Sequence, residues 1–298
     1  GAYSDSWEAG LSAVVVSTDG QPNARGGTRD IGRDSYTVSG KGSVDLAEGL
    51  ALRAAARFIR TEGQTNDSNF DRTSPTFGFI IDSPGVTFTN EAVYALVGAR
   101  AEVLDGRWTH DLSAQVAEVD RETDSPFGLT SASEGDRVKA SYVTAFKLAD
   151  EHNLTFAADW ERESFRNALA ARYPGVDSVA MYIGKRNTEG GPRYDSLDFD
   201  SFRVVGGVKG MWGDAWHWDV SATYGRNDID FVIYNTVNAS LGAAQPAGLR
   251  FSPGGNTQTE KGVNFDVGRD IETTFTAQPL RLSAGAEWRE ESFEVKAG

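Results

Sequence analysis

The chain has 298 residues, 33 glycines, no cysteine and a formal net charge of −14. The negative charge argues against a nucleic-acid partner, because the phosphate backbone would be repelled. No run of about 18 apolar residues occurs, which excludes a transmembrane helix. The absence of cysteine agrees with an oxidising compartment, in which free thiols are a liability.

Most of the chain alternates apolar and polar residues, the pattern of a β-strand with one apolar and one polar face. From Ser35 to Leu46 the even positions are apolar or small and the odd positions are polar. A helix would need apolar residues three and four apart, which these segments lack. Two segments alternate less cleanly: 91–104 is apolar on both faces, and in 262–276 the apolar positions are the odd ones. We expect about eleven strands, at residues 5–17, 34–46, 49–62, 89–104, 107–122, 135–149, 152–168, 198–213, 216–232, 262–276 and 279–296.

Short and long connections alternate between these strands, which predicts tight turns at one end of the sheet and long loops at the other. This asymmetry is typical of an antiparallel β-barrel in an outer membrane, where the short turns are periplasmic. A mean hydropathy of −0.40 is compatible with such a barrel, because only alternate side chains meet lipid. We expect the short turns at 46–49, 105–106, 149–151, 213–214 and 277–278, and the long loops at 18–33, 63–88, 123–134, 169–197 and 233–261.

The predicted fold class is therefore all-β, and residues 1–298 are expected to be one segment of an antiparallel transmembrane β-barrel. With about eleven strands, the first and the last run in the same direction and cannot pair to close an antiparallel barrel. We therefore expect the terminal strands of the barrel to lie outside this chain.

The seven tryptophans give a second indication, because amphipathic aromatic rings collect at membrane–water interfaces. Five of them lie beside expected short turns or strand starts. Trp160 and Trp288 lie about nine residues further along their strands, near the ~25 Å height of an apolar band, and charged residues follow both. The alternative is that these rings fill the core of a soluble β-sandwich. We predict a membrane-interface girdle made of Trp7, Trp108, Trp160, Trp212, Trp216, Trp218 and Trp288.

Several segments also carry a resemblance to a known family. In chain order they are Gly191–Arg193, Phe202–Gly210, Trp216–Asn227, Asn238–Gly242 and Ala284–Glu291. They resemble mid-barrel hairpins of the TonB-dependent transporters of the Gram-negative outer membrane, and residues 1–168 resemble barrel strands of that family more loosely. The resemblance implies a barrel of about 22 strands with an internal plug, driven by an inner-membrane energy-coupling complex. No plug domain is recognisable in these residues, so it is expected outside the chain.

Catalytic motifs are weak in this sequence. The segment Gly206–Gly210 has no Ser or Thr after Lys209 and no helix pattern follows it, both of which a phosphate loop needs. The histidines His110, His152 and His217 lack the spacing of metal ligands, and alternation places His110 toward lipid and His217 toward the lumen. We expect neither an enzyme activity nor a cofactor.

Aromatic residues in the expected loops are candidates for ligand binding, although they could equally pack the loops against one another. These candidates are Phe70, Phe77, Phe79, Phe127, Tyr173, Tyr182 and Tyr194. Cation binding is a further candidate role for Asp195, Asp198 and Asp200, with a polar rim as the alternative. The segment Asp67–Asp71 opens like a calcium loop, but Arg72 stands where glycine must turn the chain, so a solvated acidic loop is expected.

The leading functional prediction is a receptor in the outer membrane of a Gram-negative bacterium that takes up a scarce nutrient: a chelate, a saccharide or a cofactor. Its partners would be outer-membrane lipid, an unidentified small molecule and the inner-membrane TonB complex, reached through the plug, with no role for nucleic acid. The alternative is a passive porin or an adhesin-like barrel without energy coupling. A third class is a soluble secreted β-rich binding protein.

Overall fold

A computed structural model describes residues 1–69, 71, 73–126, 128–169, 193–213, 215–236, 249–273 and 280–298. Twelve strands form one antiparallel sheet, and two short strands, β5 and β6, form a second sheet in the connection between β4 and β7. In chain order the strands are β1 (Ala2–Ser4), β2 (Trp7–Thr18), β3 (Arg33–Ala47), β4 (Leu50–Gln64), β5 (Asp67–Ser68), β6 (Ile80–Ile81), β7 (Thr87–Val103), β8 (Trp108–Ser125), β9 (Gly128–Ala149), β10 (His152–Leu169), β11 (Arg193–Trp212), β12 (Trp216–Thr236), β13 (Leu249–Ile271) and β14 (Leu280–Ala297).

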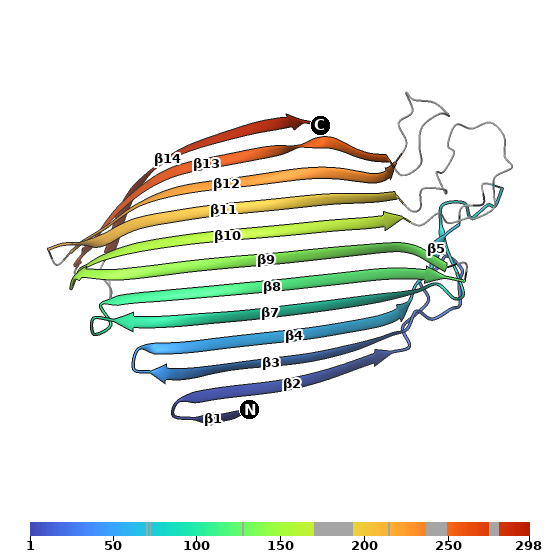
Figure 1. Ribbon diagram of the computed structural model, residues 1–298, viewed down its shortest axis with the longest axis horizontal. Coiled ribbons are helices and arrows are strands. Elements are labelled where there is room, and N and C mark those ends of the chain that lie inside the picture. The colour runs from blue at the N-terminus through green and yellow to red at the C-terminus, as the bar shows by residue number, and fades with distance from the viewer. Residues whose placement is uncertain are drawn as a thin grey trace.

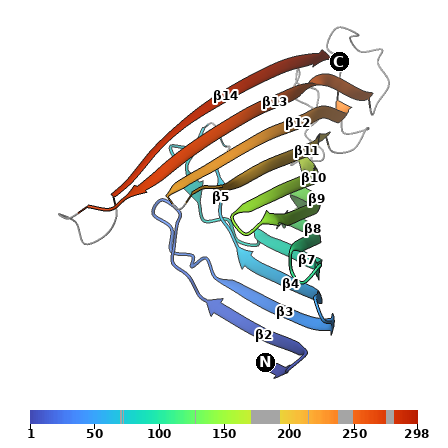
Figure 2. The same ribbon diagram turned by 90° about the vertical axis from the view of Figure 1, so that its left-hand side faces the viewer.

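The sheet has the simplest possible topology, because its strands lie side by side in the order in which they occur along the chain (Figure 1). The sheet curves steadily from β2 to β14, as the turned view shows (Figure 2). Within the described residues β14 pairs only with β13, and β1 pairs only with β2. An up-and-down meander of this kind is the arrangement of barrels that cross membranes with strands.

The expected all-β antiparallel architecture is confirmed, and the eleven long strands from β2 to β14 correspond to those predicted. Four expectations were wrong in whole or in part. The three-residue strand β1 was not predicted, and residues 123–134 are not a long loop, because β8 and β9 continue through most of them. Strands β11 and β13 likewise begin within segments expected to be loops. These extensions are mostly polar with only isolated apolar residues, and they give no alternation signal.

The strand register gathers the alternate apolar residues on one face, which we call the apolar face; the opposite one is the polar face. Along one row of partners, Val44 lies opposite Leu52, which lies opposite Ala99. Residues 91–104 and 262–276, the two segments that alternate less cleanly, also place apolar residues on the apolar face. In β13 the odd residue Phe265 pairs with Val220 and with Ala286, so odd positions of β13 lie on the apolar face. The parity changes because turn lengths differ between hairpins.

No second layer of protein covers the apolar face in the described residues. The only buried apolar side chains among them are Val86, Ala92 and Val232, whereas Leu112 is 55% exposed and Leu282 is 63% exposed. An apolar surface of this extent is a partner-binding or membrane-facing surface. The described residues include no helix that is long and apolar enough to cross a membrane.

On the polar face, one ion pair ties together strands that are not neighbours. The Arg53 guanidinium on β4 donates to both carboxylate oxygens of Asp111 on β8, at 2.7 and 2.6 Å, and so passes over β7. The residue beneath it is Gly98, where an added Cβ would lie only 2.9 Å from Arg53 Nε. Glycine at this position therefore lets the arginine side chain lie flat across β7.

This arrangement predicts that Gly98 controls the Arg53–Asp111 interaction. In a double-mutant cycle with Arg53→Gln and Asp111→Asn, the coupling free energy of unfolding should be about 0.2–1 kcal/mol, because the pair is partly exposed. Adding Gly98→Val to all four members of the cycle should reduce that coupling to about zero, since the new side chain occupies the path of the arginine. Undiminished coupling in the Gly98→Val background would contradict this account.

Candidate functional site: a tilted apolar band and a polar wall

All seven tryptophans predicted to form the girdle lie on the apolar face. Trp108 pairs in register with Phe146, Trp160 with Phe202, and Trp288 with Val263. Trp7 pairs with Val44, and Trp212 pairs with Trp216 next to the connection between β11 and β12. A sandwich core would bury such rings, but Trp160 is 41% exposed and Trp288 is 52% exposed. Their common facing is what a membrane-interface role requires; that role itself stays a prediction.

On each long strand the apolar band ends sharply in polar or charged residues on the same face. In β4 the band runs from Leu50 to Phe58 and the next residue on that face is Arg60. On every long strand except β2, where Ser17 holds the position, that residue is charged. These residues are Asp34, Arg60, Glu91, Glu118, Asp136, Arg162, Asp200, Arg226, Lys261 and Glu290.

The band crosses the sheet obliquely. Leu50 begins the band at its short-turn end in β4, and the row of register partners that starts there runs across the sheet to Trp288, which ends the band in β14. The row that starts at Phe58, the other limit of the band in β4, reaches Lys296, beyond the band in β14. Between β4 and β14 the band has therefore shifted along the strands by about its own height.

This displacement defines an angle. The shift is about eight residues over eight strand-to-strand steps, which at ~3.3 Å per residue and ~4.8 Å between strands corresponds to a tilt of about 35°. The band is about nine residues long on most strands, or ~26 Å along the strand and ~22 Å perpendicular to the tilted boundaries. Transmembrane barrels have strand tilts of about 35–45° and an apolar band about 25 Å tall. One flat slab of hydrocarbon therefore accounts for both limits of the band.

Ion pairs between neighbouring strands lie just beyond the band at the long-loop end. Arg60 contacts Glu91 at 2.6 Å, Arg162 contacts Asp200 at 2.9 Å, and Lys261 contacts Glu290 at 3.1 Å. Exposed pairs of this kind contribute little stability each. Their position matters more, because charged groups can remain hydrated only outside the hydrocarbon.

Aromatic and polar groups meet at the short-turn end of the band. Trp108 Nε1 donates to Thr144 Oγ1 at 2.8 Å, and His110 Nδ1 lies 2.8 Å from the Tyr142 hydroxyl. The Arg269 guanidinium lies 5.2 Å from the centre of the Trp216 ring. Rings with such polar contacts are suited to an interface, where one edge meets lipid and the other meets water.

The two histidines lie on the opposite faces of the sheet to which alternation assigns them. His110 lies on the apolar face, and His217 lies on the polar face with its Nε2 3.2 Å from Asp270 Oδ2. Among the residues that the structure describes, no three His, Asp or Glu side chains gather where they could hold a metal ion.

The three aspartates predicted as cation ligands do not share one face. Asp198 and Asp200 lie on the apolar face beyond the band, and Asp195 lies on the polar face. Asp200 accepts two hydrogen bonds from the Arg162 guanidinium, at 2.9 and 3.0 Å. A single ion cannot bind all three carboxylates from opposite sides of the sheet.

The loop aromatics are only partly within the described residues. Phe77 and Phe79 are half exposed in the connection between β5 and β6, and the Arg25 guanidinium lies 4.3 Å from the Phe79 ring centre. Tyr194 belongs to β11, opposite Tyr234 in register. Phe70, Phe127, Tyr173 and Tyr182 lie outside the described residues.

Two long connections are joined by one arginine. Arg29, between β2 and β3, donates hydrogen bonds from Nη1 to the backbone oxygens of Thr65 and Ser83, both at 2.9 Å, between β4 and β7. The Asp71 carboxylate, at the end of the segment that resembles a calcium loop, accepts hydrogen bonds from the backbone N–H and the hydroxyl group of Thr73. These hydrogen bonds lower the pKa of the Asp71 carboxyl group.

Comparisons with known proteins agree with this geometry at the level of fold. No protein-family model matches the sequence, and no curated protein matches it. Several solved structures do match this chain. The ferric-catecholate import receptor Fiu from E. coli K12 has a TM-score of 0.59 at 10% identity, over 99% of this chain and 58% of its own.

Two further structures show the same likeness. The siderophore receptor PiuA from Acinetobacter baumannii has a TM-score of 0.53 at 11% identity, over 97% of this chain and 47% of its own. The outer membrane transporter YddB from Escherichia coli has a TM-score of 0.52 at 12% identity, over 98% of this chain and 41% of its own. This chain spans about half the length of these structures. Its fold is that of the barrels of these outer-membrane receptors and transporters, which agrees with the fold that the resemblance in the sequence implies.

The oblique boundary predicts that residues in one register row differ in their exposure to water. In native membranes Phe58→Cys should resist a water-soluble thiol reagent, whereas Lys296→Cys in the same row should react. Leu50→Cys and Trp288→Cys, which also share a row, should both be protected because the band includes both. Equal labelling of Phe58→Cys and Lys296→Cys would mean that the band runs straight across the sheet.

The two faces should also differ in the energetic cost of a charge. Val220→Arg, near the middle of the band, should cost about 2–4 kcal/mol of unfolding free energy, because it places a guanidinium in hydrocarbon. Ser221→Arg is the matched control on the polar face and should cost less than about 1 kcal/mol. Unfolding of the refolded full-length protein in denaturant measures both values. Similar costs would indicate that protein covers both faces.

Proposed function

We propose that this chain is part of the wall of an outer-membrane receptor barrel in a Gram-negative bacterium, and that the complete protein takes up a scarce nutrient by an energy-coupled mechanism. The observation that carries the membrane assignment is the tilted apolar band, whose limits from β4 to β14 fit one flat slab of hydrocarbon. A soluble protein has no reason to align these limits along a plane that crosses the strands at an angle.

Energy coupling is supported by the kind of protein that shares this fold. Fiu is described as an import receptor and PiuA as a siderophore receptor, so both are receptors rather than general pores. A barrel large enough to contain this wall needs a plug to prevent leakage. We infer a plug domain outside residues 1–298 that contacts the inner-membrane TonB complex.

The cargo is proposed to be a chelate, a saccharide or a cofactor, captured by the long loops. Phe77 and Phe79 are the described loop aromatics with exposed rings, and these rings would stack on the planar parts of such a molecule. A ferric siderophore is the first cargo to test, because Fiu and PiuA are receptors for this class.

The proposed function predicts that uptake depends on the energy of the inner membrane. Cells that express the full-length protein should accumulate a radiolabelled ferric siderophore above the level of cells without it. A protonophore, or deletion of the inner-membrane coupling protein, should abolish this difference, because the outer membrane holds no gradient of its own. Accumulation that persists under both treatments would establish the passive porin instead.

A further inference from the structure

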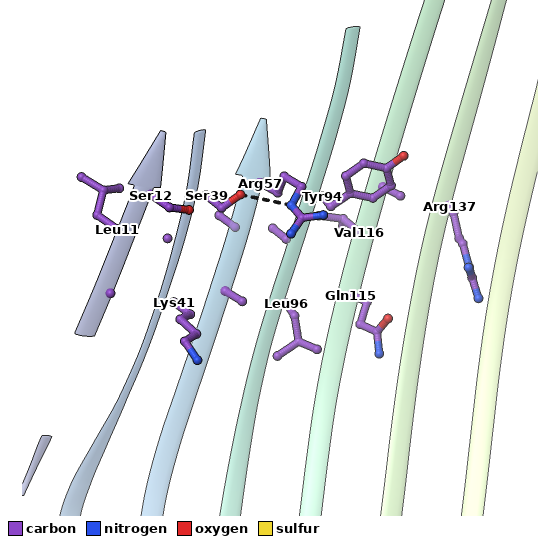
Figure 3. A pocket seen from close by; sticks show the side chains of 16 residues that line it. Leu11, Ser12, Ser39, Lys41, Arg57, Tyr94, Leu96, Gln115, Val116 and Arg137 are labelled. Carbon is purple, nitrogen blue, oxygen red and sulfur yellow. Dashed lines mark hydrogen bonds between the residues drawn. The ribbon is translucent and has the colours of Figure 1, made fainter. Parts of the chain in front are cut away.

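A hollow of about 670 Å³ lies in the polar face between β2 and β9 (Figure 3). Its floor is formed by small residues, Gly10, Ala55 and Ala117, which leave space between longer side chains on the neighbouring strands. Because these residues point away from the apolar band, the hollow opens into the lumen of the proposed barrel.

Cations line this hollow, and two of them have no carboxylate partner within the described residues. Lys41 makes no ion pair, and Arg57 donates only from Nε to the Ser39 hydroxyl, at 3.1 Å. By contrast Arg137, on the β9 side, contacts Glu161 at 2.8 Å and Glu163 at 3.2 Å.

The two unpaired cations are close enough to act together. Lys41 pairs in register with Ala55, and Arg57 is the next residue on the same face of β4, so the two are diagonal neighbours about 7–8 Å apart at Cα. Figure 3 labels both side chains, which extend from the neighbouring strands β3 and β4. One carboxylate or phosphate group between them would receive charge-assisted hydrogen bonds from both.

The remaining polar groups in the hollow suit the same kind of ligand. The Tyr94 hydroxyl, the Gln115 amide and the Ser12 hydroxyl are neutral and can donate hydrogen bonds. No carboxylate belongs to the described lining, so nothing in the hollow repels an anion. Arg53, a cation elsewhere on the polar face, is held by Asp111 and lies outside the hollow.

We propose that the hollow is a lumenal binding site for a small soluble anion with carboxylate or phosphate groups, held by Lys41 and Arg57. The site rests on the barrel part of the proposed function and does not depend on energy coupling. It would retain anionic solutes on the inner wall, in a protein whose overall charge otherwise repels them.

The test uses the full-length protein, purified from membranes in detergent, with citrate and inorganic phosphate as probes. Isothermal titration calorimetry at low salt should detect citrate binding that weakens as sodium chloride is added. The double variant Lys41→Gln/Arg57→Gln should lose about tenfold or more in citrate affinity, because charge-assisted bonds to both cations are removed. Arg57→Lys should retain most of the affinity, because it keeps the charge.

A matched control removes two cations elsewhere on the polar face. Lys147 and Arg100 are ion-paired with Asp150 and Glu102 and lie outside the hollow. Lys147→Gln/Arg100→Gln should therefore bind citrate as the unmodified protein does. Equal loss in both double variants, or no binding of either probe to the unmodified protein, would overturn the proposal. Heat-modifiable migration on a gel confirms that each variant is a folded barrel, so failure of the site is distinguishable from failure of the barrel itself.

Discussion

The constraint on which this structure depends is that backbone polar groups in hydrocarbon must be paired within the protein. A strand satisfies its hydrogen bonds only with neighbours, so a wall of paired strands can enter lipid while an isolated strand cannot. Alternate side chains then face lipid on one side and water on the other. This explains how a chain with a mean hydropathy of −0.40 can present a continuous apolar face. It also explains why residues such as Leu112 are exposed without a protein layer above them.

Much of the fold could be predicted from the sequence, because lipid imposes alternation on every strand that crosses it. The eleven long strands and the common facing of the tryptophans follow from that rule. Strand β1 and the outer parts of β8 and β9 could not be predicted, since water on both sides imposes no alternation. The tilt of the band could not be predicted either, because it depends on the register between strands. Leu50 and Trp288 are connected only through eight successive strand pairings.

The polar face was the least predictable part of the structure. Alternation assigns Lys41 and Arg57 to the polar face, but it does not reveal which charged groups lack partners. That requires three or more strands in register, as the passage of Arg53 across Gly98 to Asp111 illustrates. The apolar face carries the proposed contact with the membrane, whereas the polar face carries the proposed binding site. The lumenal function is therefore inferred from the pairing of charges on the polar face.

The central claim is that a flat membrane cuts this sheet at an angle to its strands. Polarised infrared spectroscopy of the full-length protein in oriented bilayers measures the mean strand tilt directly from the amide dichroism. The account predicts a tilt of about 35–45° from the membrane normal. Strands that lie in the plane of the membrane, or that show no preferred orientation, would contradict it.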